Sequence, residues 1–545
     1  MSHQTNPLSR RSLLAGATTA SALAGVGTAR AQARKTVLVI GLDISDGRNY
    51  DPARSADLTP PLTMGAVYDT LITLSTDDLV NVKPALATSW SLVKDGTAWR
   101  FALRPGVKFW NGDAMTAEDV KFSLDRLINI KDQPASYAAN MGAVSIVDAM
   151  TVEIAMKNPK EPLLLDLTAP SFAIYSAKLT AANGAVATPG ADQADKATPW
   201  LNGNSAGTGP YRMVGWERNV SVTLQKNPHY WGVAVPFERV VIRHIADGAA
   251  QLLAVRRGDI DIAMNLAAEQ LDSLKGNADI TTIQGGSTDT LYFMMTSNPE
   301  LNAALAKREA RQAVAHAIDY EGLIKGLVGG FADRPASFLP AGIAGTTLEQ
   351  TREFGFKEDL AKAKAMLVAA GVPNGFEFEL IFPSAAYFST SYALMAQKIQ
   401  ADLVRVGVKM TLKPMDNVNW RAQFNGGKAQ ATIAPWTSPS PNPYLWTGAS
   451  VQRVAKRVGW EPSAEIVGLV SQGAAEIDIA KQAAIYKRYQ QILIEQANYA
   501  TLMQPIYRIA AHKNVTNVKL TANVWKIELA PVSYTHLTLP TNREV

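Results

Sequence analysis

The chain has 545 residues, 47% hydrophobic and 19% charged, with a formal net charge of +5, a composition typical of a globular protein with a large core. The length favours more than one domain, and the small net charge without a basic cluster argues against a nucleic-acid partner. The absence of cysteine excludes disulfides, thiolate metal sites, iron–sulfur clusters, a cysteine nucleophile and a lipid-modified N-terminal cysteine.

The first 31 residues have the pattern of an export signal. Arg10 and Arg11 precede a weakly hydrophobic run of small residues that ends near Gly27, and residues 29–31 form an A-x-A cleavage site. This pattern is typical of a twin-arginine (Tat) signal peptide, with an ordinary secretory signal as the alternative. The run is too short and too rich in Ala, Gly and Thr to span a bilayer as a stable helix. We therefore expect a mature protein that is exported, soluble, periplasmic and not lipid-anchored.

Regular elements begin after this signal. Residues 36–42 form a nearly continuous apolar run, which indicates a buried parallel strand. The segment 82–130 predicts a hairpin around Asp95-Gly96 and then a helix capped by Thr116, whose first turn carries Glu118 and Asp119. Further along, a strand–helix–strand order over residues 376–414 indicates α/β organisation with parallel strand pairs.

Patterns associated with catalysis are weak. Residues 203–207 match G-x-S-x-G around Ser205, but a nucleophile elbow needs a preceding strand and a following helix, and here a loop precedes and a strand follows. The sequence contains no H-E-x-x-H, no P-loop and no G-x-G-x-x-G after a strand, and His316 lies in an Ala-rich helix that favours packing. We predict no catalytic residue, no bound metal and no cofactor.

Several short motifs resemble those of one family. Five of them occur in order between residues 84 and 120: PALAxSW, KDG, LRPGVKF, NGD and TAEDV. GTGPYR at 207–212, NPHYWG at 227–232 and RQAVAHAID at 311–319 follow at plausible spacings. Together they resemble the signatures of the family 5 extracellular solute-binding proteins, which are the peptide, nickel and related binding proteins of ABC importers.

The resemblance covers about residues 36–530 and implies a fold. It is the α/β, large two-lobed periplasmic binding protein fold of type II, cluster C, with an extra inserted domain. Ligand is expected to bind between the lobes, which open and close about a hinge near Asp289 and Gln504. The expected segments are a signal peptide (1–31), lobe 1 in three parts (36–78, 206–288 and 505–530), an inserted domain of lobe 1 (79–205), lobe 2 (289–504) and a non-native tail (533–545). The alternative for the last segment is a natural disordered tail.

One departure from the family bears on the ligand. Peptide-binding members carry an acidic residue after the position of Trp436, and it pairs with the ligand's α-ammonium, but here residues 437–444 read TSPSPNPY. The departure favours a neutral polar ligand, such as a sugar, a blocked peptide or an opine-like molecule, with Ser440 among the hydrogen-bonding candidates. The expected ligand-binding residues are Trp436, Thr437, Ser438, Asn442, Trp420, Tyr444 and Asp57. Packing in the core is the alternative for the tryptophans, and simple solvation is the alternative for Asp57.

The resemblance also implies a function. A substrate-binding protein of an ABC transporter captures a small solute, here a peptide or peptide-like molecule, and delivers it to a membrane permease with its ATPase subunits. We expect a monomer that is not an enzyme. The alternatives are a Tat-exported periplasmic hydrolase, and a ligand sensor or chaperone on the same fold.

Overall fold

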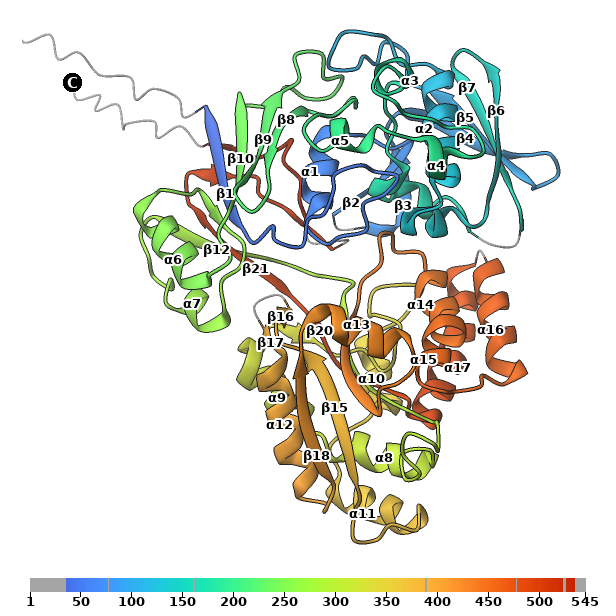
Figure 1. Ribbon diagram of the computed structural model, residues 1–545, viewed down its shortest axis with the longest axis vertical. Helices are drawn as coiled ribbons and strands as arrows, with labels where there is room; N and C mark the ends of the chain where they lie inside the picture. Colours follow the sequence, from blue (N-terminus) through green and yellow to red (C-terminus); the bar gives the residue numbers. More distant parts are fainter. Residues whose placement is uncertain are drawn as a thin grey trace, which may run out of the picture. The chain divides into compact units, whose positions relative to one another are not determined.

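The computed structural model describes residues 36–76, 78–159, 162–387, 390–476, 478–522 and 526–534 (Figure 1). The expected signal peptide and residues 535–545 of the expected tail lie outside the described residues. Of the described helices, none combines the length and the apolar character needed to cross a bilayer.

A seven-stranded sheet holds the first core. Its order is β12-β21-β11-β1-β10-β9-β8, and β1 (Val37–Leu42) pairs in parallel with β10 and β11, as the apolar run predicts. The other strands are β8 (Tyr211–Glu217), β9 (Ser221–Lys226), β10 (Arg239–His244), β11 (Ile262–Ala263), β12 (Ile280–Gly285) and β21 (Tyr507–His512). Helices of this part are α1 (Pro60–Val67), α6 (Gly248–Arg257) and α7 (Ala268–Asp272).

The segment between β1 and β8 carries a smaller antiparallel sheet of order β4-β5-β7-β6. As predicted, β4 (Ala87–Val93) and β5 (Ala98–Leu103) form a hairpin, and α2 (Ala117–Ile130) starts at a Thr116 capping box closed by Asp119. Its remaining elements are β6 (Met141–Asp148), β7 (Thr151–Met156), α3 (Ala177–Ala181), α4 (Ala191–Ala194), α5 (Thr198–Leu201), and the hairpin of β2 (Ile72–Ser75) and β3 (Asp78–Pro84).

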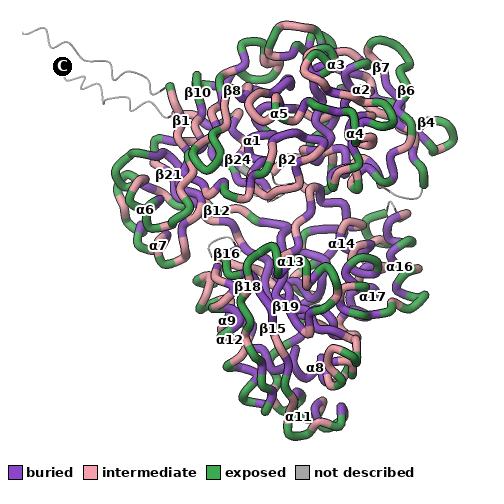
Figure 2. Tube along the Cα trace, in the orientation of Figure 1, coloured by how far each residue is buried: buried purple, intermediate pink, exposed green. Residues whose placement is uncertain are grey.

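A six-stranded sheet of order β14-β20-β13-β19-β15-β18 holds the other large core, and its central strands are buried along their length (Figure 2). The predicted strand–helix–strand unit is confirmed, because β15 (Glu377–Pro383) pairs in parallel with β18 (Lys409–Met415) across α12 (Tyr392–Val404). The remaining strands are β13 (Thr290–Met295), β14 (Ala332–Asp333), β19 (Ala431–Trp436) and β20 (Tyr499–Pro505). The main helices are α8 (Arg308–Ala317), α9 (Tyr320–Val328), α10 (Leu348–Phe354), α11 (Leu360–Ala369), α13 (Asn417–Asn425), α14 (Tyr444–Ala449), α16 (Ala464–Ala475) and α17 (Ile479–Gln496).

Two chain connections, β12 to β13 and β20 to β21, link the two large sheets. They are cross-braced: Gln504 Nε2 donates to the Ser287 carbonyl at 2.6 Å, and Ser287 Oγ donates to the Pro505 carbonyl at 2.5 Å. The Tyr507 hydroxyl also donates to Asp289 Oδ2. Of the two residues at which the hinge is expected, Asp289 lies on the first connection, and Gln504 is the last but one residue of β20, just before the second.

The last described residues pair with the folded chain. The short strand β25 (Ser533–Tyr534) is antiparallel to β22 (Val515–Thr516), and the Tyr534 ring meets Phe237 edge-on at 5.1 Å between centroids. The first two residues of the segment expected to be a tail thus contact the core of the seven-stranded sheet.

Candidate functional site

The candidate site lies at one edge of the six-stranded sheet. Because β15 is parallel to both β18 and β19, all three end at this edge, at Pro383, Met415 and Trp436. The antiparallel β13 begins there, with Thr290 opposite Trp436. In α/β sheets, ligands bind in the crevice beyond the carboxyl ends of the strands. The connections to the seven-stranded sheet leave from the same edge.

The predicted loop after β19 is tied to the inserted domain by one carboxylate. Ser440 Oγ donates to Asp166 Oδ1 at 3.0 Å, and Asn442 Nδ2 donates to both Asp166 oxygens at 3.0 Å. Ser438 Oγ donates within the loop, to the Ser440 carbonyl at 2.7 Å. All four side chains are buried. Asp166, in the inserted domain of lobe 1, therefore brings a carboxylate to residues 437–444, which contain no acidic residue of their own.

Asp166 was missed in the sequence, although a signal for it exists. It is a single charged residue in an otherwise apolar stretch, residues 162–170, and its neighbours Leu163 and Leu167 pack into the core of the inserted domain. A charge is seldom buried without a partner. The sequence identifies Asp166 as unusual, but not Asn442, 276 positions away, as its partner.

Three more predicted residues cluster with this loop. Trp436 packs on Phe338, and the Arg453 guanidinium lies over its ring at 4.9 Å from the centroid. Thr437 Oγ1 is 3.0 Å from the Tyr387 hydroxyl. The backbone N–H of Tyr444 donates to Asn442 Oδ1 at 3.0 Å.

The other two predicted residues, Trp420 and Asp57, make no described hydrogen bond to this loop, although Trp420 shares a hydrophobic core with Trp436. Trp420 is 5% exposed, stacks on Phe424 and donates its indole N–H to Thr432 Oγ1 at 2.9 Å, so it is a core residue with a satisfied polar atom. Asp57 pairs with Arg48, whose Nε donates to Asp57 Oδ1 at 2.8 Å. Neither side chain forms a hydrogen bond or ion pair with residues 436–444 among the described interactions.

A second buried carboxylate stands at the start of β13. Asp289 has no exposed surface, and burial raises its pKa to about 7 while the hydroxyls of Thr437 and Tyr387 lower it. The other oxygen, Asp289 Oδ1, is buried, and no described residue forms a hydrogen bond of normal geometry with it. The sequence marked this residue only as part of a hinge.

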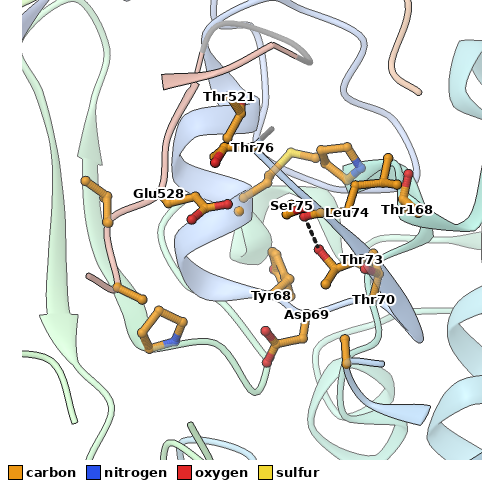
Figure 3. Close-up of a pocket in the computed structure, with 18 of the residues that line it drawn as sticks. Tyr68, Asp69, Thr70, Thr73, Leu74, Ser75, Thr76, Thr168, Thr521 and Glu528 are labelled. Atoms are coloured by element: carbon orange, nitrogen blue, oxygen red, sulfur yellow. Dashed lines mark hydrogen bonds between the residues drawn. The ribbon is translucent and has the colours of Figure 1, made fainter. Parts of the chain in front are cut away.

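A separate cavity of about 290 Å³ lies between α1, the β2–β3 hairpin and residues 521–522 and 527–531 (Figure 3). Two acids, Asp69 and Glu528, line it. Asp69 is held by two motif residues, since Thr208 Oγ1 donates to it at 2.7 Å and Trp231 Nε1 at 2.8 Å. Burial raises the pKa of Asp69. These contacts give two of the family-like motifs, GTGPYR and NPHYWG, a structural role.

The G-x-S-x-G match does not form a nucleophile elbow. Ser205 is buried, and its Oγ accepts a hydrogen bond from the Met213 backbone N–H at 3.0 Å. The next regular element is the strand β8, where the elbow requires a helix. The strand predicted to follow Ser205, in place of the helix that an elbow needs, is therefore confirmed.

Two large sheets joined by two connections, an inserted domain, and a polar loop between them define a two-lobed solute-binding protein of the periplasmic type. A family model described as "Bacterial extracellular solute-binding proteins, family 5 Middle" matches residues 81–454, and the chain belongs to this family. The resemblance and the type II fold class expected from the sequence are both confirmed.

Relatives are similar over most of the chain. The probable D,D-dipeptide-binding periplasmic protein DdpA of Escherichia coli K12 is 27% identical over 501 residues, covering 89% of this chain and 92% of that protein. The di/tripeptide-binding protein 2 of Pseudomonas aeruginosa is 25% identical over 528 residues, covering 91% and 95%. Among solved structures, periplasmic binding protein DppA from Helicobacter pylori, in complex with the peptide STSA, has a TM-score of 0.75 at 22% identity, covering 92% and 98%.

Proposed function

We propose that this protein is the substrate-binding component of an ABC importer, and that it captures a peptide or peptide-like solute between its lobes for delivery to a membrane permease. Family membership and the peptide-binding relatives support this function. The observation that carries it is the contact of the loop after β19 with Asp166 of the opposite lobe. We further propose that the chain is exported by its twin-arginine signal, acts in the periplasm as a monomer and has no catalytic activity.

A ligand screen tests this function. The mature protein, unfolded and refolded to remove bound ligand, is examined by thermal shift with free peptides, N-blocked peptides, sugars, opines and nickel chelates. A compound present at about 100 times its dissociation constant adds roughly 2.7 kcal/mol of stability, which gives a clear rise in melting temperature. We expect this rise with peptides or peptide-like compounds. If no class shifts the melting temperature, the transport function is wrong.

The bridge between the lobes makes a separate prediction. Asp166→Ala removes the acceptor of three hydrogen bonds and leaves the Ser440 hydroxyl and the Asn442 amide without it. Because this bridge favours the arrangement in which both lobes meet the ligand, we expect the dissociation constant to rise about 10-fold, or about 1.4 kcal/mol. Isothermal titration with a compound that shifts the melting temperature measures this change.

Asp113→Ala is the matched control. Asp113 belongs to the same inserted domain and pairs at 3.3 Å with Lys178, whose side chain is 83% exposed. Exposed ion pairs contribute little, so this variant should bind like the parent protein. Equal dissociation constants for the two variants would show that Asp166 has no part in binding.

A further inference from the structure

A peptide with a free N-terminus brings an ammonium group, and a binding site that encloses it must supply a negative charge. Residues 437–444 contain no acid, and Asp166, which contacts this loop from the inserted domain, already accepts hydrogen bonds from Ser440 and Asn442. Under the proposed function, on which this inference rests, another acid must take that part. We propose that Asp289 is the anchor for the ammonium group of the ligand.

Strand register places Asp289 beside the loop. Thr290 pairs with Trp436 in the β13–β19 ladder, so the preceding residue, Asp289, lies opposite Thr437, where the loop begins. Tyr387, which follows β15 at the same edge, puts its hydroxyl 3.0 Å from Thr437 Oγ1. The carboxylate thus lies among hydroxyl groups at the edge where α/β sheets bind their ligands.

One oxygen of this carboxylate is held and the other is not. The Tyr507 hydroxyl donates to Oδ2, which fixes the side chain against the connection to the other lobe. Oδ1 is buried without a hydrogen bond of normal geometry among the described residues. A buried acceptor without a partner costs about 1–3 kcal/mol, and a charged one costs more. An ammonium group donates three hydrogen bonds and satisfies both the free oxygen and its charge.

No charge of the protein competes for Asp289. The titratable groups that face it are phenols, those of Tyr507 on β21, Tyr387 on the short strand β16 (Ala386–Tyr387) and Tyr292 on β13, which are neutral at physiological pH. No ion pair links Asp289 to a lysine, arginine or histidine within the described ranges. Asp289 is therefore a buried acid that has no cationic partner among the described residues.

Proton linkage follows from this arrangement. Burial raises the pKa of Asp289 to about 7, so at pH 6 the group is mostly protonated before ligand arrives. An ammonium group stabilises the charged form, so binding at pH 6 should release close to one proton. Affinity for an amine should then rise about tenfold per pH unit below pH 7 and level off above pH 8.

The probes are L-alanyl-L-alanine, D-alanyl-D-alanine and their N-acetyl forms, titrated into the full mature protein in two buffers of different ionisation enthalpy. The parent protein should bind a free dialanine with release of close to one proton at pH 6. Asp289→Asn should bind that dialanine at least about 100-fold more weakly, with no proton release, and should bind the N-acetyl form like the parent.

Each remaining outcome decides the matter. Equal affinity of the parent protein for the free and the N-acetyl dialanines overturns the proposal, and that measurement needs no variant. The proposal is also overturned if Asp289→Asn binds a free dialanine as tightly as the parent protein does, provided that the melting temperature of the variant shows a folded protein. If no dialanine binds while another compound class does, the anchor is wrong and the transport function stands; if no compound class binds, the transport function itself fails.

Discussion

Replacing Arg126 with methionine is expected to lower the free energy of unfolding by about 3–5 kcal/mol, because it removes the closer countercharge of two buried carboxylates, which Arg54 approaches only to 3.9 and 4.0 Å. Arg126 has no exposed surface. Its guanidinium donates to both oxygens of Asp51, at 2.8 and 2.7 Å, and to both oxygens of Asp195, at 2.8 and 2.9 Å. Urea unfolding followed by tryptophan fluorescence measures the loss.

The pH dependence of this loss has a definite sign. Burial raises the pKa of Asp195, but the hydrogen bond and charge of Arg126 outweigh it and hold that pKa below its usual value. The pair therefore stabilises the parent protein above the unfolded-state pKa, and this contribution falls as the pH drops through the lowered folded-state pKa. In Arg126→Met the hydrogen bonds and charge that hold down the pKa of Asp195 are lost, so the difference between variant and parent should shrink from pH 7.5 to pH 4.

Arg488→Met is the control for Arg126→Met. Arg488 pairs with Glu465 at 2.8 Å on the surface, where their side chains are 43% and 53% exposed. An exposed pair of this kind is worth at most about 1 kcal/mol. If both methionine variants lose the same stability, the buried network does not hold the inserted domain to the rest of the lobe.

This network shows what the sequence could not predict. The strand β1, the hairpin around Asp95, the cap at Thr116 and the strand–helix–strand unit were all predicted, because each depends on residues close together in the chain. Arg126 lies on a predicted helix, yet its partners are 75 and 69 positions away. Pairing over such distances follows from the tertiary fold and not from local pattern.

The candidate site was predicted in the same uneven way. The resemblance singled out the loop after Trp436, and in the structure its polar residues contact the opposite lobe. No local pattern joins these polar residues to Asp166 or to Asp289. Trp420 was a candidate because a tryptophan's large ring suits a pocket as well as a core, and its hydrogen bond to Thr432 is visible only in the structure.

Gly209→Ala is expected to cost about 3 kcal/mol or more, because the added methyl group overlaps backbone that cannot move aside. A Cβ at Gly209 would lie 2.6 Å from the Val67 carbonyl carbon and 2.7 Å from the Ala66 oxygen, at the end of α1. The Gly209 N–H also donates to the Val67 carbonyl at 3.3 Å, so the two segments are held at this distance. The second glycine of GTGPYR, Gly209, is thus required by the close approach of two backbones.

Gly215→Ala separates this close approach from the general effect of replacing a glycine. Gly215 lies in the neighbouring strand β8, and a Cβ there would meet nothing within 4 Å. With a compatible backbone, such a change should leave stability unaltered or raise it by about 0.4–1 kcal/mol through the unfolded chain. In urea unfolding, the midpoint of Gly209→Ala should therefore fall, and that of Gly215→Ala should rise or stay unchanged. Equal losses would mean that β8 is intolerant of any side chain, and that contact with α1 does not explain the motif.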